Sequence, residues 1–123
     1  MRFTITYIAK KKGEGVMYKN IEKKTKLKLG DLVEYQDGQV VSKTLVQNEA
    51  VSVTLFSFDK HEEISTHASC GDALVTVLDG VGKFTVGGEE FILKEGESLV
   101  MPQGIPHAVF GEEKFKMMLV VSF

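Results

Sequence analysis

The sequence is poor in cysteine and arginine, and it has no long apolar run. Its single cysteine, Cys70, cannot close a disulfide within the chain, so we expect a protein of the reducing cytoplasm. Arg2 is the only arginine, which argues against nucleic-acid binding because guanidinium groups usually contact phosphates and base edges. No run approaches the roughly 20 apolar residues of a membrane span, and the N-terminus lacks the apolar core of a signal peptide.

Helical periodicity is nearly absent as well. Leu29–Val33 is the only candidate, a single turn for which Asp31 would serve as a cap. From Tyr35 onward, β-rich runs alternate with turns roughly every 8–12 residues, a spacing that predicts an all-β, antiparallel sandwich or small barrel. The expected strands, about ten in number, are residues 2–8, 40–46, 51–58, 64–67, 73–78, 83–86, 90–93, 98–101, 107–110 and 115–123, with residues 16–21 as a further candidate.

Charge divides the chain into two parts. Residues 1–28 carry a balance of +7, whereas the remainder carries −9. A chain of 123 residues is expected to form one domain. We therefore expect residues 1–38 to supply an N-terminal strand and a basic arm, which belong to the same fold as a barrel over residues 39–123. The arm would lie on the acidic barrel or on a partner subunit.

The stretch from Gly96 to His107 organises the rest of the chain. Pro102 fixes φ and lacks a donor, so the strand before it should end there. Gly104 can supply the positive φ of a reversal, and Pro106 favours an extended residue before it. His107 is thus expected to enter a new strand at a defined position.

Three histidines are candidate functional residues. His61 lies in a polar turn and is expected to be solvated. His67 and His107 each adjoin an apolar strand, and we expect them to meet inside the barrel. Counting in twos from His67 predicts which residues share its face. The predicted pocket lining is His67, Ser69, Ala73, Val75, Val77, Met101, His107 and Met117, with Leu99 and Leu119 as further wall residues.

Two chemistries remain open for this pair. In one, the imidazoles bind a small organic ligand by hydrogen bonds, without a full metal centre. In the other, His67 and His107 hold a divalent metal (Zn, Ni, Fe or Mn), with water or Cys70 completing its shell. A firmly held metal usually has three or more protein ligands, and the sequence offers two.

The sequence resembles a known family, the cupins, over about Val40–Val121. The family's second motif is matched at Gly96, Pro102, Gly104 and His107, and its closing Asn falls at Gly111. In its first motif, His67 and Gly80 match. The departures are His61 for the opening Gly, Ser69 for the second His and Ala73 for the Glu.

The resemblance implies a double-stranded β-helix, or jelly-roll barrel. Metal-dependent cupins, such as dioxygenases and isomerases, use three His and one Glu, of which two positions remain here. The family also implies a homodimer formed through N-terminal strands, a role that Arg2–Ile8 suits. Our expectation is a dimeric cupin that binds a small organic ligand. The alternatives are a metal-dependent enzyme or a purely structural module.

Overall fold

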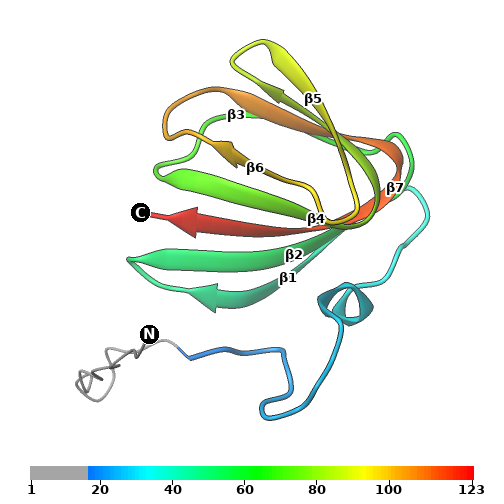
Figure 1. The fold of residues 1–123 in the computed structure, drawn as a ribbon, viewed down its shortest axis with the longest axis vertical. Coiled ribbons are helices and arrows are strands. Elements are labelled where there is room, and N and C mark those ends of the chain that lie inside the picture. The colour runs from blue at the N-terminus through cyan, green and yellow to red at the C-terminus, as the bar shows by residue number, and fades with distance from the viewer. Residues whose placement is uncertain (1–16) are drawn as a thin grey trace, which may run out of the picture.

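The computed structural model describes residues 17–123 and shows an all-β, antiparallel barrel, which confirms the predicted fold class (Figure 1). The only helix in this part of the chain is the 3-10 turn η1, Leu29–Leu32, so no described helix is long and apolar enough to cross a membrane. The strands are β1 Val40–Gln47, β2 Val51–Phe58, β3 Glu63–His67, β4 Asp72–Val86, β5 Glu89–Lys94, β6 Ser98–Met101 and β7 His107–Ser122.

Two long strands, β4 and β7, hold the barrel together. They pair with each other along almost their whole length. The first half of β4 also pairs with β6 and its second half with β5, while β7 pairs first with β3 and then with β2. Two arrays result, β1-β2-β7-β4-β6 and β3-β7-β4-β5, which curl toward each other as Figure 1 shows.

The predicted breaks within these strands were wrong. We expected residues 73–78 and 83–86 to be separate strands, and likewise residues 107–110 and 115–123. Instead each pair is one strand, and the ladder between β4 and β7 shifts register at Val77/Asp79 and at Gly80/Gly82. Asp79-Gly80 therefore forms a bulge rather than a turn, because the partner strand continues opposite it.

Glycine is needed at this bulge for two reasons. Gly80 has a φ of +76°, in the left-handed region that favours glycine. A Cβ built on Gly80 would also overlap the carbonyl oxygen of Lys114. At Gly82 a Cβ would lie 2.7 Å from the ring of Phe115, which is fully buried. The bend between the two arrays thus depends on close backbone approach.

The barrel has two cores, one on each side of the sheet. Inside, Phe58 and Phe115 stack with ring centroids 4.4 Å apart, and Phe84 meets Phe115 edge to face at 5.9 Å. Outside, Val53 and Leu55 of β2 are buried together with residues of the segment that precedes β1. Both faces of the β1-β2-β7 side are therefore covered.

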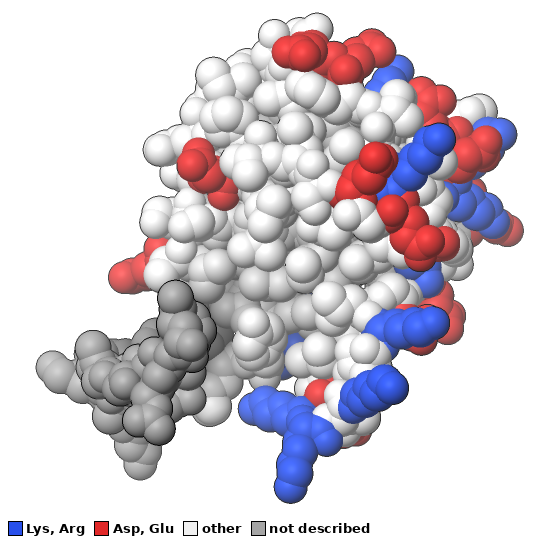
Figure 2. All heavy atoms as spheres, in the orientation of Figure 1, with Lys and Arg blue, Asp and Glu red and all other residues white. Residues whose placement is uncertain are grey.

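The segment before β1 covers the outer face through apolar contacts. Ile21, Leu29 and Leu32 pack against the outer core. The hydroxyl of Tyr35 donates to Asp79 Oδ2 at 2.5 Å, and Lys116 Nζ donates to the carbonyl of Gly30 at 2.6 Å. Figure 2 shows lysines at the lower edge and mixed charges along the right side of this view, with few charges in the middle.

Three of our expectations concern strands and a helical turn in the chain before β1. The strand expected at residues 2–8 lies outside the described residues. Residues 17–21 of the further candidate form no strand. The single helical turn is confirmed as η1, but Asp31 does not cap it, because Lys28 occupies the cap position without a side-chain hydrogen bond.

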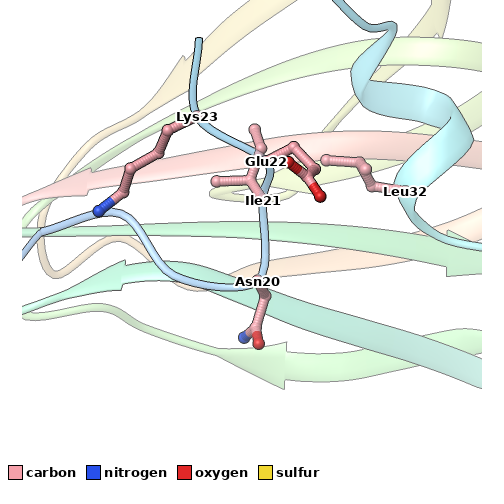
Figure 3. Close-up of a pocket in the computed structure, with 5 residues that line it drawn as sticks. All are labelled: Asn20, Ile21, Glu22, Lys23 and Leu32. Carbon is pink, nitrogen blue, oxygen red and sulfur yellow. The ribbon is translucent and has the colours of Figure 1, made fainter. Parts of the chain in front are cut away.

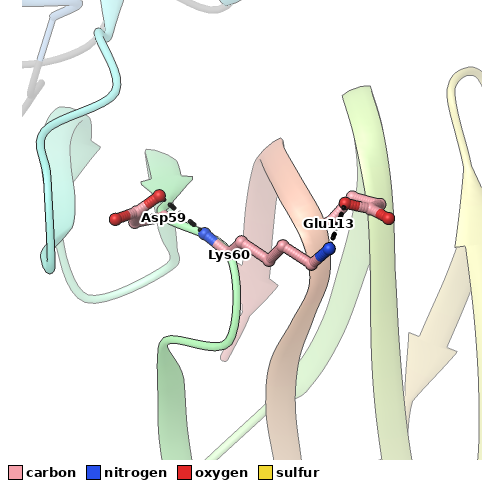
Figure 4. A network of polar contacts seen from close by, with 3 residues as sticks. All are labelled: Asp59, Lys60 and Glu113. Atoms are coloured by element: carbon pink, nitrogen blue, oxygen red, sulfur yellow. Dashed lines mark hydrogen bonds and ion pairs between the residues drawn. The ribbon is translucent and has the colours of Figure 1, made fainter.

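The turn between β2 and β3 is held by Asp59. Its carboxylate accepts from the backbone N–H groups of Gly38 at 2.7 Å and Lys60 at 2.8 Å. Lys60 Nζ reaches Glu113 at 3.3 Å (Figure 4). His61 follows with a φ of +70°, a conformation usually left to glycine, and its ring stacks on Phe110 with centroids 5.7 Å apart.

Candidate functional site

The structure brings His67 and His107 together as cross-strand partners. β3 ends at His67 and β7 begins at His107, and the two residues lie opposite each other in the antiparallel ladder. Their ring centroids are 4.3 Å apart with an interplanar angle of 69°. His107 is 3% exposed, whereas His67 is exposed. The predicted meeting of these two histidines inside the fold is observed as a pair at the rim of the barrel.

Backbone carbonyls fix the tautomer of both rings. Nδ1 of His67 donates to the carbonyl oxygen of Ser65 at 2.8 Å, and Nδ1 of His107 donates to that of Ile105 at 3.2 Å. Because a carbonyl oxygen only accepts, each Nδ1 must carry the proton in these bonds. In the neutral ring, Nε2 is then left with a free lone pair. Each imidazole therefore offers an acceptor, or a metal ligand, at Nε2.

Burial favours the neutral form of His107. It lowers the pKa of His107, and the positive charge that His67 can carry lowers it further. The hydrogen bond to the carbonyl of Ile105 raises the pKa of His107, because the protonated ring donates the same bond and is stabilised by it. The buried imidazole thus favours the neutral form, which is the form that accepts hydrogen bonds or binds metals.

The other residues of the predicted pocket lining differ in how deeply they are buried. Ala73, Val75, Val77, Met101 and Met117 are all at most 1% exposed and belong to the inner core. The two further predicted wall residues, Leu99 and Leu119, are half-buried and pack against this inner core.

Ser69 supports the site through the loop between β3 and β4. Its hydroxyl donates to the carbonyl of Gly71 at 2.6 Å, and its own carbonyl accepts from Gly104 N–H at 3.1 Å. The second bond ties this loop to the turn that precedes His107. Ser69 therefore positions both histidine loops, and its hydroxyl is already engaged with the backbone.

Within residues 17–123, no group of three His, Cys, Asp or Glu side chains gathers as a metal would require. Cys70 is exposed in the loop after His67. Asp72 accepts from Gln103 N–H at 2.8 Å and so braces the loop before His107. Among the described residues, the two imidazoles are the nitrogen ligands that a metal would use.

Four cavities of the described chain lie away from the histidines, beside the segment that precedes β1. One of about 640 Å³ is lined by Asn20, Ile21, Glu22, Lys23 and Leu32, where that segment crosses the sheet (Figure 3). Another, of about 550 Å³, includes Tyr18, Val53 and Met118 on the outer core. Neither histidine lines any of these four hollows.

Sequence reasoning missed the hydroxyl residues of β1 and β2 that face the inside, among them Thr44 and Thr54. The alternation Val51-Ser-Val-Thr-Leu55 suggests that Ser and Thr face solvent outside the protein. The structure buries Val53 and Leu55 in the outer core instead. Phe56 and Phe58 occupy alternate positions with Thr54 and pack in the inner core. These two aromatic residues were the sequence signal that this face of β2 is also buried.

A family model described as Cupin domain matches residues 54–123. A conserved protein of unknown function from Streptococcus pyogenes is 43% identical, with a TM-score of 0.84 over 86% of this chain and 93% of that one. A cupin superfamily protein from Desulfitobacterium hafniense is 31% identical, with a TM-score of 0.83 over 86% and 97%.

A third solved structure, a Cupin 2 conserved barrel domain protein from Leptotrichia buccalis, is 51% identical over 77% of this chain and 46% of that one, with a TM-score of 0.76. No curated protein matches. The family model covers more than half of the sequence. The chain belongs to the cupin superfamily.

Proposed function

We propose that the rim of the barrel binds a small organic ligand through His67 and His107. The observation that carries this proposal is the pairing of two imidazoles whose Nδ1–H groups are both engaged by backbone carbonyls. Both Nε2 atoms therefore accept, and the ligand must supply hydrogen-bond donors such as hydroxyl or amide N–H groups. Leu99 and Leu119, which are half-buried against the inner core, would cover its carbon surface.

Native mass spectrometry of protein purified without denaturation tests this. We expect a small molecule that is retained by wild type and by His61→Gln, and released from His67→Ala. His67 is exposed, so its loss should leave the fold intact, whereas His107→Ala also removes a buried side chain. The proposal would be contradicted if wild type and His67→Ala retained the molecule equally. It would also be contradicted if no sample held a bound molecule after incubation with cell extract metabolites.

A metal-dependent cupin enzyme, of dioxygenase or isomerase type, is the second candidate. One observation favours it: histidines that bind metals commonly donate the other ring N–H to a carbonyl, as both rings do here. Nε2 of His67 and of His107 would hold Zn, Ni, Fe or Mn, with water or Cys70 completing the shell. Such a metal would supply Lewis-acid or redox chemistry, and the two imidazoles would hold and orient it.

Elemental analysis distinguishes the two candidates. The metal candidate predicts near-stoichiometric metal in wild type that is lost in His67→Ala and reduced in Cys70→Ser if the thiol is a ligand. The ligand candidate predicts unchanged ligand retention in chelated protein. Wild type that takes up none of the four metals during incubation would rule out the metal-dependent candidate.

A further inference from the structure

The inner faces of β1 and β2 carry a group of four hydroxyl side chains. Phe58 packs in the inner core, and residues at alternate positions along a strand share a face. The hydroxyls on this face, which we call the hydroxyl wall, belong to Ser42, Thr44, Ser52 and Thr54. Thr44 lies directly opposite Thr54 in the ladder between the two strands.

The same row of the sheet becomes apolar beyond the hydroxyl wall. Thr54 of β2 lies opposite Leu119 of β7, and Leu119 lies opposite Val75 of β4. Val75 in turn lies opposite Leu99 of β6. One continuous row therefore passes from two hydroxyls on β1 and β2 to three aliphatic side chains on the remaining strands. This row of the inner face is therefore polar at one end and apolar at the other.

The hydroxyl wall is accessible and unengaged within residues 17–123. Ser42 is exposed and the other three residues are half-buried. None of the four hydroxyls forms a hydrogen bond with a described residue, in contrast to Ser57 on the outer face, which donates to the carbonyl of Glu34 at 2.7 Å. A hydroxyl both donates and accepts, so the wall can bind either kind of polar group.

Charged side chains are nearly absent from the inner face. Among the described strand positions with inward parity, the acidic or basic residues are two glutamates that lie away from the hydroxyl wall. Glu89 is at the tip of the hairpin between β4 and β5, and Glu113 is exposed and pairs with Lys60 at 3.3 Å. An ion placed between the hydroxyl wall and Leu99 would lose water without gaining a fixed opposite charge, which is costly, and only a protonated His67 could supply one to an anion. An uncharged molecule loses far less.

We propose that the ligand is an uncharged molecule with hydroxyl, ether or carbonyl groups on one side and carbon surface on the other. This inference rests on the proposed ligand-binding function and adds the class of ligand. The polar side would meet the hydroxyl wall and the carbon surface would cover Leu99 and Leu119. The paired imidazoles would accept from its hydroxyl groups.

Three probes built on one ring test the inference: trans-cyclohexane-1,2-diol, cyclohexanecarboxylate and cyclohexylammonium. We would titrate each into the full chain and follow amide and methyl resonances by NMR. The expected result is saturable binding of the diol, with shifts at Thr54, Leu99 and Leu119, and binding of both ions at least tenfold weaker.

Thr54→Val removes one hydroxyl at nearly constant shape. We expect it to weaken diol binding about fivefold, the usual effect of one neutral hydrogen bond. Thr76→Val is the matched control, because the Thr76 hydroxyl is on the outer face and pairs with that of Ser98 at 2.7 Å. It should leave diol binding unchanged.

This inference would be overturned if either ion bound as tightly as the diol. It would also be overturned if Thr54→Val bound the diol as tightly as wild type does. His67→Ala separates that failure from a failure of the proposed function. If His67→Ala weakens probe binding while Thr54→Val does not, the histidine site stands and the hydroxyl wall does not contribute. If none of the three probes binds, the inference is overturned.

Discussion

His67 and His107 lie opposite each other across two antiparallel strands, with their ring centroids 4.3 Å apart and both Nδ1 atoms bound to backbone carbonyls. His67 is exposed, whereas His107 is buried, with 3% of its surface accessible. The pair therefore joins a fixed, buried imidazole to one that a ligand can reach. Protonation of both rings at once would place two positive charges side by side.

This pair makes stability depend on pH. The folded protein lowers the pKa of His107, chiefly by burial and then by the charge of His67, so the unfolded chain binds the proton more readily. The stabilising contribution is complete above the unfolded pKa of about 6.5. It declines as the pH falls through that value toward the lower folded pKa. We expect the free energy of unfolding, measured with urea, to fall between pH 7.5 and pH 5.

His107→Gln isolates this effect from the titration of carboxylates. The difference in unfolding free energy between wild type and His107→Gln should shrink as the pH falls. A constant difference across the range would contradict the assignment to His107.

Gly80 is predicted to be intolerant of substitution. Gly80→Ala places a Cβ against the carbonyl of Lys114 and imposes a left-handed conformation, so we expect a loss of about 4 kcal/mol or more. Gly88→Ala is the matched control, because Gly88 has a φ of +84° but no atom within 4 Å of the added Cβ. Its cost should be about 1 kcal/mol. Equal costs in thermal unfolding would show that the clash is relieved by movement.

Tyr35 anchors the N-terminal segment to the bulge in β4. Tyr35→Phe removes the bond to Asp79 and should lower the unfolding free energy by about 1 kcal/mol, since the freed carboxylate returns to water. Burial, followed by the bond and charge of Asp79, raises the pKa of Tyr35, so its absorbance should titrate above that of an ordinary tyrosine. Tyr18→Phe, at a residue 56% exposed, should have little effect.

Hydrogen exchange should show that the two arrays open together. β4 and β7 contribute ladder bonds to both arrays, so neither array can unfold without exposing amides of the other. We expect amides of β4 before and after Gly80 to exchange with one common free energy under native conditions. A lower value for the half that pairs with β5 would identify a separable unit.

Much of the fold follows from sequence pattern. Ser98–Met101 is a strand as expected, since Gly96 precedes it and Pro102 ends it. The pairing of His67 with His107 also agrees with expectation. The continuity of β4 was not predictable, because Asp-Gly marks a turn in isolation and becomes a bulge only when a partner strand runs opposite.

The orientation of β2 could not be predicted for a different reason. Alternation identifies the buried face of a strand only when the other face meets water. Here the segment before β1 covers Val53 and Leu55, so both parities contain buried apolar residues. The hydroxyl wall, the homodimer and the cytoplasmic location remain predictions.

The bulge at Gly80 has a consequence for how the site selects its occupants. Because two shared strands cross between the arrays and pack closely there, we expect the described barrel to bend little at this point. The rim would then be an opening whose diameter is set before any molecule arrives. In the proposed site, discrimination by size would come from side chains such as Leu99 and Leu119, and exchanging them for smaller or larger residues should retune the site without altering its scaffold.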